Sequence, residues 1–542
     1  MSAPAATLRE EFCNLHGGDG GRGDAETLLE VACRHSRTLR EAVAIHGEST
    51  LDGYLASSCG AFATDPARLA DLVDSVRRCS APLLGTRVAD LLEEEILANP
   101  VALTTNHHGV DFFAQSVQGT LIFSLRRRRD GSPVKVVPVF ACGAVPLDNL
   151  TYPQGMLVYG AKSPDLKDIP RRLPVFSNRY RRQLVSVAPA IDREMLGRAE
   201  HRALRLRRTG EVSPRLCDTI VELLREEYGA DEILSRDNYS DQSVALNQRL
   251  WRRLLTDERE RPELVYIELE KITADLLERD LARGEGITHL LLFDPELRGQ
   301  VLNVLDDARA CWNRTGLVAR LTASAESSRP KISATACGTM FFWGITDSGR
   351  RVPLLLDSAA QGDARLRGID DRGRPWSWPF TPDALIEGLR EQRLLPSLFT
   401  CFLEVSLTRG VACLGGYHQT KYLPVIQQGI AEAMARVDCP ASEITRIAAV
   451  TTRGYLAGMQ ATMQRTDDRR LVPAGPLEII AAGGLGAGDV MRLRNFRVRD
   501  AHIASLTETI PDLVTPQPPE PNWRSDLARS CAGLLRGGVV LS

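Results

Sequence analysis

The feature that most constrains the fold of this chain is a polar hexad set into an apolar stretch near residue 100. The hexad, residues 104–109 (TTNHHG), follows Val101-Ala102-Leu103 and precedes the largely apolar residues 110–125. We interpret the tripeptide as the end of a buried strand and residues 110–125 as a helix, an arrangement that builds ligand sites at the carboxyl edge of open α/β sheets. The N–H groups that open such a helix are available to an anion. Because unpaired polar groups are costly to bury, the hexad is expected to face a cavity.

Length and composition describe an ordinary globular protein of several parts. The 542 residues are too many for one core, so two to four subdomains are expected. The net charge of −2 lacks the basic imbalance typical of nucleic-acid binding. No apolar stretch reaches the roughly 18–20 residues of a membrane span, and residues 1–24 lack the apolar core of a secretory signal. We therefore expect a cytoplasmic protein with neither a nucleic-acid nor a membrane partner.

The distribution of the cysteines also favours a reducing cytoplasm. Twelve are scattered singly, and none forms a CxxC pair, which argues against a zinc knuckle or a redox motif. Most lie in apolar contexts, where a cysteine is usually a small core residue.

Periodicity divides the chain into six regions. The fold class is predicted as α/β, with a parallel-sheet core, a helical insertion and a helical N-terminal region. The strand at 135–140 is the second of a βαβ unit, and residues 288–293 (THLLLF) are read as a third. The regions are a helical N-terminal region at 1–100, the first part of the core at 101–180, a helical insertion at 181–285, the second part of the core with a β-hairpin at 286–425, a mixed α/β region at 426–511, and a Pro-rich linker and tail at 512–542.

Two local patterns refine the second part of the core. Residues 339–345 and 351–356 flank a glycine-containing turn and predict a β-hairpin. Thr381 followed by Pro382 predicts the N-cap and first position of a helix.

The adjacent histidines His107 and His108 are the first candidates for chemistry. Neighbours on a strand or turn point apart, and no helical metal motif accompanies them, so metal ligation is disfavoured. Hydrogen bonding to a substrate phosphate or carboxylate is favoured, since histidine changes charge near neutrality. The alternative is a histidine satisfied within the core.

A second candidate segment begins at Gly415-Gly416. The glycines permit close backbone approach to a ligand, and on a helix the polar side chains of residues 417–422 would share faces. The alternative is a glycine turn before an amphipathic surface helix. The pair Glu268 and Glu270 could form a carboxylate site, although such residues more often line an exposed face. Residues 483–488 do not match a dinucleotide fingerprint and predict a flexible loop.

Taken in order, these segments resemble the bacillithiol-synthesis cysteine-adding enzyme family over roughly residues 100–425. Residues 105–109 (TNHHG) stand where that family has a Thr-Gly-Gln-Gln-x-Gly turn, and residues 136–140 (VVPVF) repeat its next strand. Gly415-Gly416 with Gln419 and Tyr422 stand in place of its Gly-Gly…Glu…Tyr segment. The chain departs at residues 142–148 (CGAVPLD), where the family has an acidic Glu-Asp-His-Asp segment. The resemblance implies a nucleotidyltransferase-like Rossmann core and an enzyme that adds cysteine to a glucosaminyl malate amine, forming an amide.

The leading functional hypothesis is a biosynthetic ligase or transferase that joins an amine or amino acid to an acyl or nucleotide-activated small molecule. ATP or ADP is the expected cofactor, no metal is expected, and a homodimer is a possible assembly. The alternatives are a hydrolase or lyase with a histidine base in the same cleft, and a non-catalytic ligand-binding protein. The predicted catalytic residues are His107, His108 and His418, and the predicted substrate- or nucleotide-binding residues are Thr105, Asn106, Gly109, Asp148, Asn149, Gly415, Gly416, Gln419, Lys421 and Tyr422.

In this hypothesis the candidate residues form two walls. Asn106 and the two hexad histidines orient an anionic group at the sheet edge, and Asp148 and Asn149 complete that wall. The residues after the diglycine close the other side, with Lys421 neutralising phosphate or developing charge. A histidine acts as general base on the attacking amine.

Overall fold

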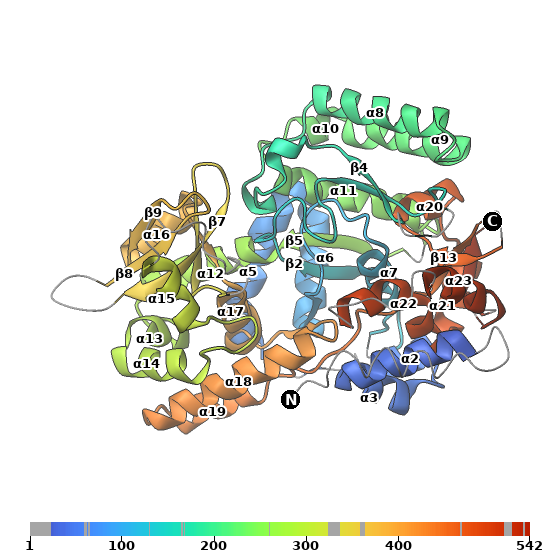
Figure 1. Ribbon diagram of the computed structural model, residues 1–542. Coiled ribbons are helices and arrows are strands. Elements are labelled where there is room, and N and C mark those ends of the chain that lie inside the picture. The colour runs from blue at the N-terminus through green and yellow to red at the C-terminus, as the bar shows by residue number, and fades with distance from the viewer. Residues whose placement is uncertain are drawn as a thin grey trace.

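The protein is a mixed α/β protein built around a four-stranded parallel sheet (Figure 1). The computed structural model describes residues 23–58, 62, 65–128, 130–163, 166, 169–259, 261–322, 337–357, 364–466, 469–513, 523–534 and 537–541. Most of the predicted linker and the chain before residue 23 lie outside these ranges.

The sheet has the strand order β11-β1-β2-β5. Leu103 is in register with both Leu414 and Val139, and β2 pairs with β5 over six residues. The strands are β1 (Val101–Leu103), β2 (Val136–Ala141), β5 (Glu263–Glu268) and β11 (Ala412–Leu414). The parallel β1-α7-β2 unit confirms the βαβ prediction, with α7 at Ala114–Ser124.

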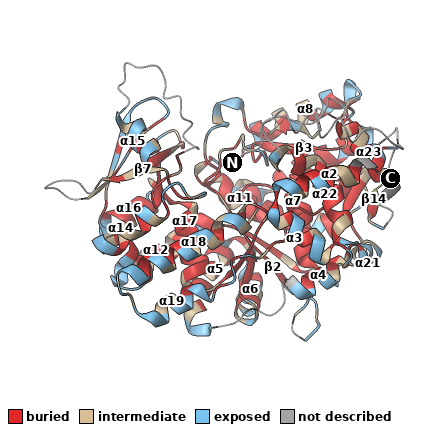
Figure 2. Ribbon diagram, turned by 60° about the horizontal axis from the view of Figure 1, so that its bottom comes forward, coloured by how far each residue is buried: buried red, intermediate tan, exposed pale blue. Residues whose placement is uncertain are grey.

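Both faces of this sheet are buried, because successive side chains of a strand point to opposite faces. One face joins the core of α7, α11 and the C-terminal helices through Leu103, Val139 and Tyr266. The other face packs on α5, α6 and α12 through Ala102, Phe140 and Ile267. Figure 2 shows the buried centre, with exposed residues on the outer helices.

A second lobe carries a five-stranded antiparallel sheet and its own apolar core. The order is β10-β6-β7-β8-β9, and Trp343 pairs with both Leu395 and Pro353. The strands are β6 (Phe342–Ile345), β7 (Arg351–Asp357), β8 (Arg365–Ile369), β9 (Pro375–Pro379) and β10 (Leu394–Pro396).

The remaining elements surround these two sheets. The small strands are β3 (Gly155–Val158), β4 (Arg171–Pro174), β12 (Thr462–Arg465), β13 (Leu471–Pro473) and β14 (Val539–Leu541). The helices of the first half are α2 (Gly23–His35), α3 (Arg37–His46), α4 (Leu51–Ser58), α5 (Pro66–Leu84), α6 (Thr86–Ala98), α8 (Arg193–Arg208), α9 (Pro214–Glu222), α10 (Asp231–Leu234), α11 (Tyr239–Leu254) and α12 (Leu269–Arg283). Those of the second half are α13 (Ile287–Phe293), α14 (Pro295–Val304), α15 (Arg314–Thr322), α16 (Pro382–Arg390), α17 (Leu398–Phe402), α18 (Gln419–Arg436), α19 (Ala441–Ala448), α20 (Pro476–Ala481), α21 (Ala487–Asn495), α22 (Val498–Leu513) and α23 (Trp523–Leu534).

Several local predictions are confirmed, and one strand is wrong. The predicted hairpin is β6-β7, and Thr381 caps α16 with Pro382 at its first turn. Residues 288–293 form the helix α13 rather than a strand, because they pack one helical face into the core of the second lobe. The third strand of the central sheet in chain order is instead β5, which lies within the range 181–285 predicted as a helical insertion.

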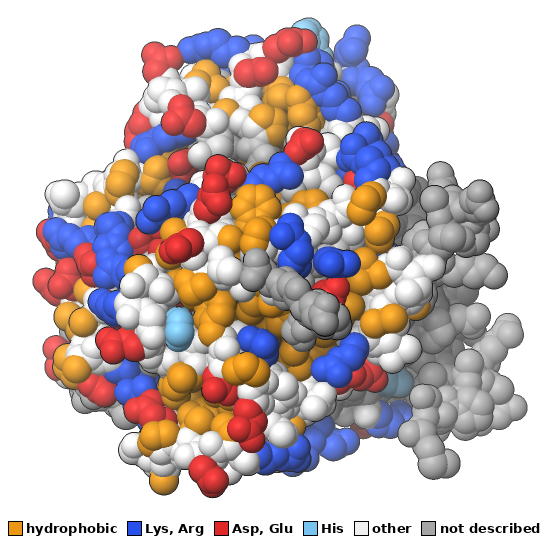
Figure 3. Space-filling model, turned by 90° about the vertical axis from the view of Figure 1, so that its left-hand side faces the viewer, with side chains coloured by type: hydrophobic (Ala, Val, Ile, Leu, Met, Phe, Trp, Pro, Cys, Tyr) orange, Lys and Arg blue, Asp and Glu red, His pale blue; other side chains and the backbone are white. Residues whose placement is uncertain are grey.

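The surface of the second lobe mixes both signs of charge. Figure 3, which views the side carrying α13–α16, shows Lys and Arg interspersed with Asp and Glu. None of the described helices combines the length and apolarity that crossing a membrane requires.

Candidate active site at the carboxyl edge of the parallel sheet

The strand order places the two predicted segments beside each other. The hexad follows β1, and Gly415-Gly416 follows β11, the neighbouring strand. The helix that follows β1, α7, packs on one face of the sheet. The helix that follows β11, α18, contributes Leu423 to the core on the other face. Divergence of this kind defines a topological switch point, where open parallel sheets bind ligands at the carboxyl ends of their strands.

His108 begins a buried chain of hydrogen bonds at this edge. Its Nε2 lies 3.2 Å from the carbonyl oxygen of Ser240 and 3.0 Å from its Oγ. Since a carbonyl only accepts, Nε2 carries the proton and Nδ1 holds a free lone pair. Ser240 Oγ in turn donates to Glu268 Oε2 over 2.5 Å. Burial lowers the pKa of His108, and the charge of Glu268 only partly opposes this shift. The imidazole is therefore neutral at pH 7.

Three buried acceptors at the edge have no donor among the described residues. They are His108 Nδ1, Asn106 Oδ1 and Gln419 Oε1. The side-chain nitrogens of Asn106 and Gln419 fix which way each amide points. Asn106 Nδ2 donates to Asp111 Oδ2, and Gln419 Nε2 donates to the carbonyl oxygen of Cys413. A buried acceptor without a donor is costly, so the edge is prepared to receive N–H or O–H groups.

A pair of buried carboxyl groups lies at the adjoining strand end. Glu268 ends β5, and Glu270 sits in the first turn of α12. Glu270 accepts from the backbone N–H groups of Gly143 (2.6 Å) and Ala144 (2.9 Å) and from Cys142 Sγ (3.1 Å). Burial, together with the negative charge of Glu268, raises the pKa of Glu270 to about 7. The pair therefore holds a proton near neutrality, as acid–base sites do.

The N-terminus of α7 is occupied by the chain itself, contrary to the expectation of an anion there. Asp111 Oδ1 accepts from the N–H of Phe113, and Tyr159 Oη accepts from the N–H of Ala114. Burial raises the pKa of Asp111 to about 6, although hydrogen bonds from Ser116 and Tyr266 oppose this. With Asp111, Glu268 and Glu270 nearby, the hexad is a poor environment for a phosphate or carboxylate.

His107 points away from His108, as expected for neighbours on a turn. Its Nδ1 lies 3.1 Å from Asn149 Oδ1, so the structure joins these two predicted residues. Burial lowers the pKa of His107, while the Asn149 contact opposes the shift. Asp148 instead faces Arg181 across 3.8 Å.

The predicted glycines serve the packing of the chain. A Cβ on Gly415 would overlap the side chain of Gln419, and one on Gly109, at a φ of +121°, would lie 2.7 Å from Pro153 Cβ. Gly416 is more open, since its Cβ would meet Thr105 Oγ1 at 3.4 Å. Gly415 thus permits the close approach of Gln419, and its predicted contact with a ligand stays a prediction.

The residues after the diglycine separate into different environments. Gln419 Nε2 donates to Thr104 Oγ1 over 2.8 Å, which joins the two segments directly. His418 Nε2 instead contacts Asp512 of α22 at 3.0 Å. Tyr422 packs on Phe402, and Lys421 is exposed. Of the predicted second wall, only Gln419 meets the hexad.

Sequence reasoning missed Ser240 and undervalued the carboxyl pair. Ser240 and Glu268 reach His108 from strands and helices that are more than 100 residues away along the chain, and nothing near Ser240 signals the contact. The signal for the carboxyl pair was available: Glu268 directly follows the apolar run 264–267, and Glu270 comes two residues later, which predicts a strand end and not an exposed face.

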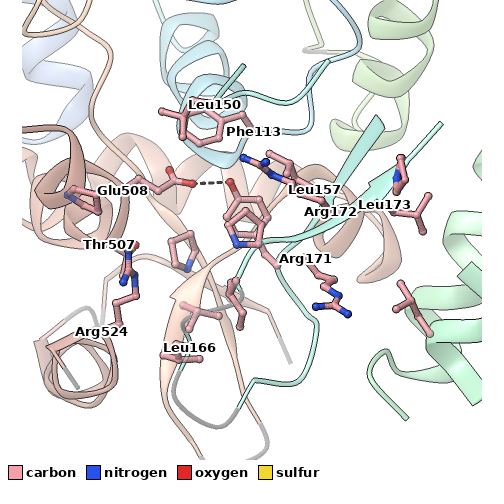
Figure 4. Close-up of a pocket in the computed structure, with 18 of the residues that line it drawn as sticks. Phe113, Leu150, Leu157, Leu166, Arg171, Arg172, Leu173, Thr507, Glu508 and Arg524 are labelled. Atoms are coloured by element: carbon pink, nitrogen blue, oxygen red, sulfur yellow. Dashed lines mark hydrogen bonds between the residues drawn. The ribbon is translucent and has the colours of Figure 1, made fainter. Parts of the chain in front are cut away.

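A cavity beside the β3-β4 hairpin is centred away from this edge. It has a volume of about 710 Å³ (Figure 4). Its lining includes Phe113, Tyr159 and Asp512, which contact residues of the edge. Within the described part of the chain, no three His, Cys, Asp or Glu side chains converge to hold a metal ion.

The fold and the site alone define the class of this protein: it is an α/β protein with a cluster of buried polar side chains at the switch point of its parallel sheet. No model of a protein family, no curated protein and no solved structure matches this chain.

Proposed function

We propose that the protein is an amide-forming ligase or transferase in which His108 deprotonates an attacking amine at the switch point. The observation that carries this proposal is the set of buried acceptors without donors on His108, Asn106 and Gln419. An ammonium group has three N–H donors and a positive charge, so it matches both these acceptors and the nearby carboxyl groups.

The chemistry follows from the protonation state of His108. The bound ammonium first gives one proton to Nδ1, which frees its lone pair. The nitrogen then attacks the acyl carbon, the bond to the leaving group breaks with its electron pair, and the second N–H proton passes to the leaving group. Glu268, acting through Ser240, would stabilise the imidazolium that forms, as a carboxylate behind a histidine does in other acyl-transfer sites. Glu270 can return or accept a proton near pH 7.

A Rossmann-like, nucleotidyltransferase-like relationship is part of this proposal and is supported by the parallel sheet and its strand order. A nucleotide phosphate, however, does not suit the edge, because the α7 N-terminus is capped by Asp111 and Tyr159. We therefore assign no step to ATP or ADP.

The test is a screen for amide products. Primary amines and amino acids are incubated with thioester, acyl phosphate or carboxylate-plus-ATP donors, and products are detected by mass spectrometry. His108→Gln keeps a donor toward Ser240 but removes the Nδ1 base, so we expect kcat to fall by about 10²- to 10⁴-fold with the fold intact.

The matched control is His502→Asn. His502 is also fully buried, and burial lowers its pKa to about 4, but it bonds the carbonyl of Gly458 in another part of the core. Equal losses in both variants would contradict a special role for His108. Donor cleavage by water without any amine would instead support the hydrolase alternative.

A further inference from the structure

The cavity in Figure 4 lies between the β3-β4 hairpin, α8 and the C-terminal helices α22 and α23. Its volume of about 710 Å³ is within the range of small-molecule sites, which span roughly 300–1,000 Å³. None of the predicted site residues lines it.

The charges around this cavity are unbalanced. Five arginines line it, Arg171, Arg172, Arg202, Arg205 and Arg524, against two carboxyl groups, Glu508 and Asp512. Glu508 accepts from Tyr159 Oη over 2.6 Å and from Gln460, and burial raises its pKa to about 7. Asp512 is engaged by Tyr417 and His418. The lining therefore presents a clear excess of positive charge.

Most of these arginines lack a carboxylate partner among the described residues. Arg171 pairs with Glu211 at 2.9 Å. By contrast, Arg172 lies over the ring of Tyr152, and Arg524 lies over that of Trp523. Burial lowers the pKa of Arg524, and no carboxylate opposes that shift. Guanidinium groups left in this state are ready to bind an anion.

Apart from Tyr159 and Thr507, the rest of the lining is apolar. Leu157, Leu173 and Val472 are buried in the wall, and Leu150 is 62% exposed beside them. The other apolar lining residues are Phe113, Leu166, Ile169, Pro170, Pro174, Leu206, Pro473 and Pro511. A small inorganic anion would leave this surface unfilled, whereas a hydrocarbon chain or ring would cover it.

We propose that this cavity binds an amphipathic anion, a phosphate or carboxylate carried on a hydrocarbon body, with the head group on Arg172, Arg205 and Arg524 and the body against the leucine and proline wall. This site is independent of the proposed amide-forming reaction, since the lining contains neither the three acceptor residues His108, Asn106 and Gln419 nor the carboxyl pair.

The test uses decyl phosphate below its micelle concentration, with binding followed by calorimetry. Arg172→Gln, Arg205→Gln and Arg524→Gln are each expected to weaken binding about tenfold, because each removes a charge-assisted contact. Arg208→Gln is the matched control, since Arg208 lies on the same helix, α8, but does not line the cavity, and it should leave the affinity unchanged.

Two further probes separate the contribution of the anionic head group to binding from that of the hydrocarbon body. Inorganic phosphate and neutral decanol should each bind at least tenfold more weakly than decyl phosphate. If decanol binds as tightly, or if the cavity variants bind decyl phosphate as tightly as the intact protein, the proposal is overturned.

The source of the anion is resolved with vesicles. Arginine-dependent binding to phosphatidylglycerol vesicles, absent with phosphatidylcholine, would assign the head group to a lipid. Binding of decyl phosphate without vesicle binding would assign it to a soluble metabolite. His108→Gln should bind decyl phosphate normally, so failure of the amide-forming reaction leaves this result unaffected.

Discussion

At the scale of single residues, the sheet edge depends on a few groups held very close together. Gly143 lies where the β2 loop crosses Glu268, and a Cβ there would come 2.7 Å from Glu268 Oε1 and would also overlap Ser186 Oγ. The carboxyl pair and the loop that donates to Glu270 are therefore mutually dependent.

Gly143→Ala should accordingly destabilise the protein. We expect a loss of about 1–3 kcal/mol in the free energy of unfolding, because the methyl group overpacks a buried polar site. Urea titration measures this loss. Gly299→Ala on α14 is the control, since no heavy atom lies within 4 Å of its added Cβ, and it should be neutral or stabilising. Equal effects of the two changes would contradict the tight geometry.

Cys142 provides a chemical probe of the same site. Burial raises the pKa of its thiol well above the usual value, and the charge and hydrogen bond of Glu270 raise it further. Since only the thiolate reacts, iodoacetamide should modify Cys142 slowly at pH 8 although the residue is only half-buried. Glu270→Gln should increase the rate, and mass spectrometry of the peptide measures it, with Cys439 as the internal reference. An unchanged rate would contradict the contact.

At the scale of elements, α11 positions Ser240 in its first turn. Asn238 caps this helix, with Oδ1 accepting from the N–H of Asp241 over 2.8 Å. The cap therefore stabilises the N-terminus of α11, where Ser240 contacts His108 and Glu268.

Asn238→Ala should lower the free energy of unfolding by about 1 kcal/mol, the usual cost of losing an N-cap. Asn238→Ser keeps a capping oxygen and should recover most of the loss. Chemical denaturation of the three proteins decides this, and an alanine variant as stable as the parent would show that the cap contributes nothing.

The elements also show which parts of the fold were predictable. The βαβ unit and the β6-β7 hairpin were found from local patterns, since turns and apolar runs are encoded by neighbouring residues. Residues 288–293 were misread because a short buried helix and a buried strand share the same apolar composition. The hexad was correctly placed at the carboxyl edge, but Ser240 and Glu268 arrive through tertiary packing that spacing does not reveal. The anion site stays a prediction, and Glu268 and Glu270, which make the hexad a poor environment for an anion, come from a distant segment.

At the scale of the whole molecule, several buried carboxyl groups share one property. Burial raises the pKa values of Glu270, Glu404, Glu478 and Glu508 to about 7. In the folded state these groups hold protons that the unfolded chain releases above its ordinary glutamate pKa of about 4.5. Their contribution to stability is thus present at low pH and is lost as the pH rises from about 4.5 to about 7.

Glu478 allows this dependence to be measured away from the carboxyl edge of the parallel sheet. Its carboxyl accepts from the backbone N–H groups of Tyr159, Gly160 and Gly475. Glu478→Gln should reduce the difference in unfolding free energy between pH 5.5 and pH 8 by about 2 kcal/mol. Denaturant titrations at the two pH values measure it, and an unchanged difference would mean that Glu478 is ionised in the folded protein.

The central claim is that His108 presents an unprotonated Nδ1 to a donor at the switch point. The most direct measurement is the ¹⁵N chemical shift of both ring nitrogens in histidine-labelled protein, assigned with His108→Gln. We expect a protonated Nε2, an unprotonated Nδ1 at pH 7, and a shift of the Nδ1 signal when the amine substrate binds. A proton on Nδ1 in the free protein, or an Nδ1 signal that a bound amine leaves unmoved, would contradict it.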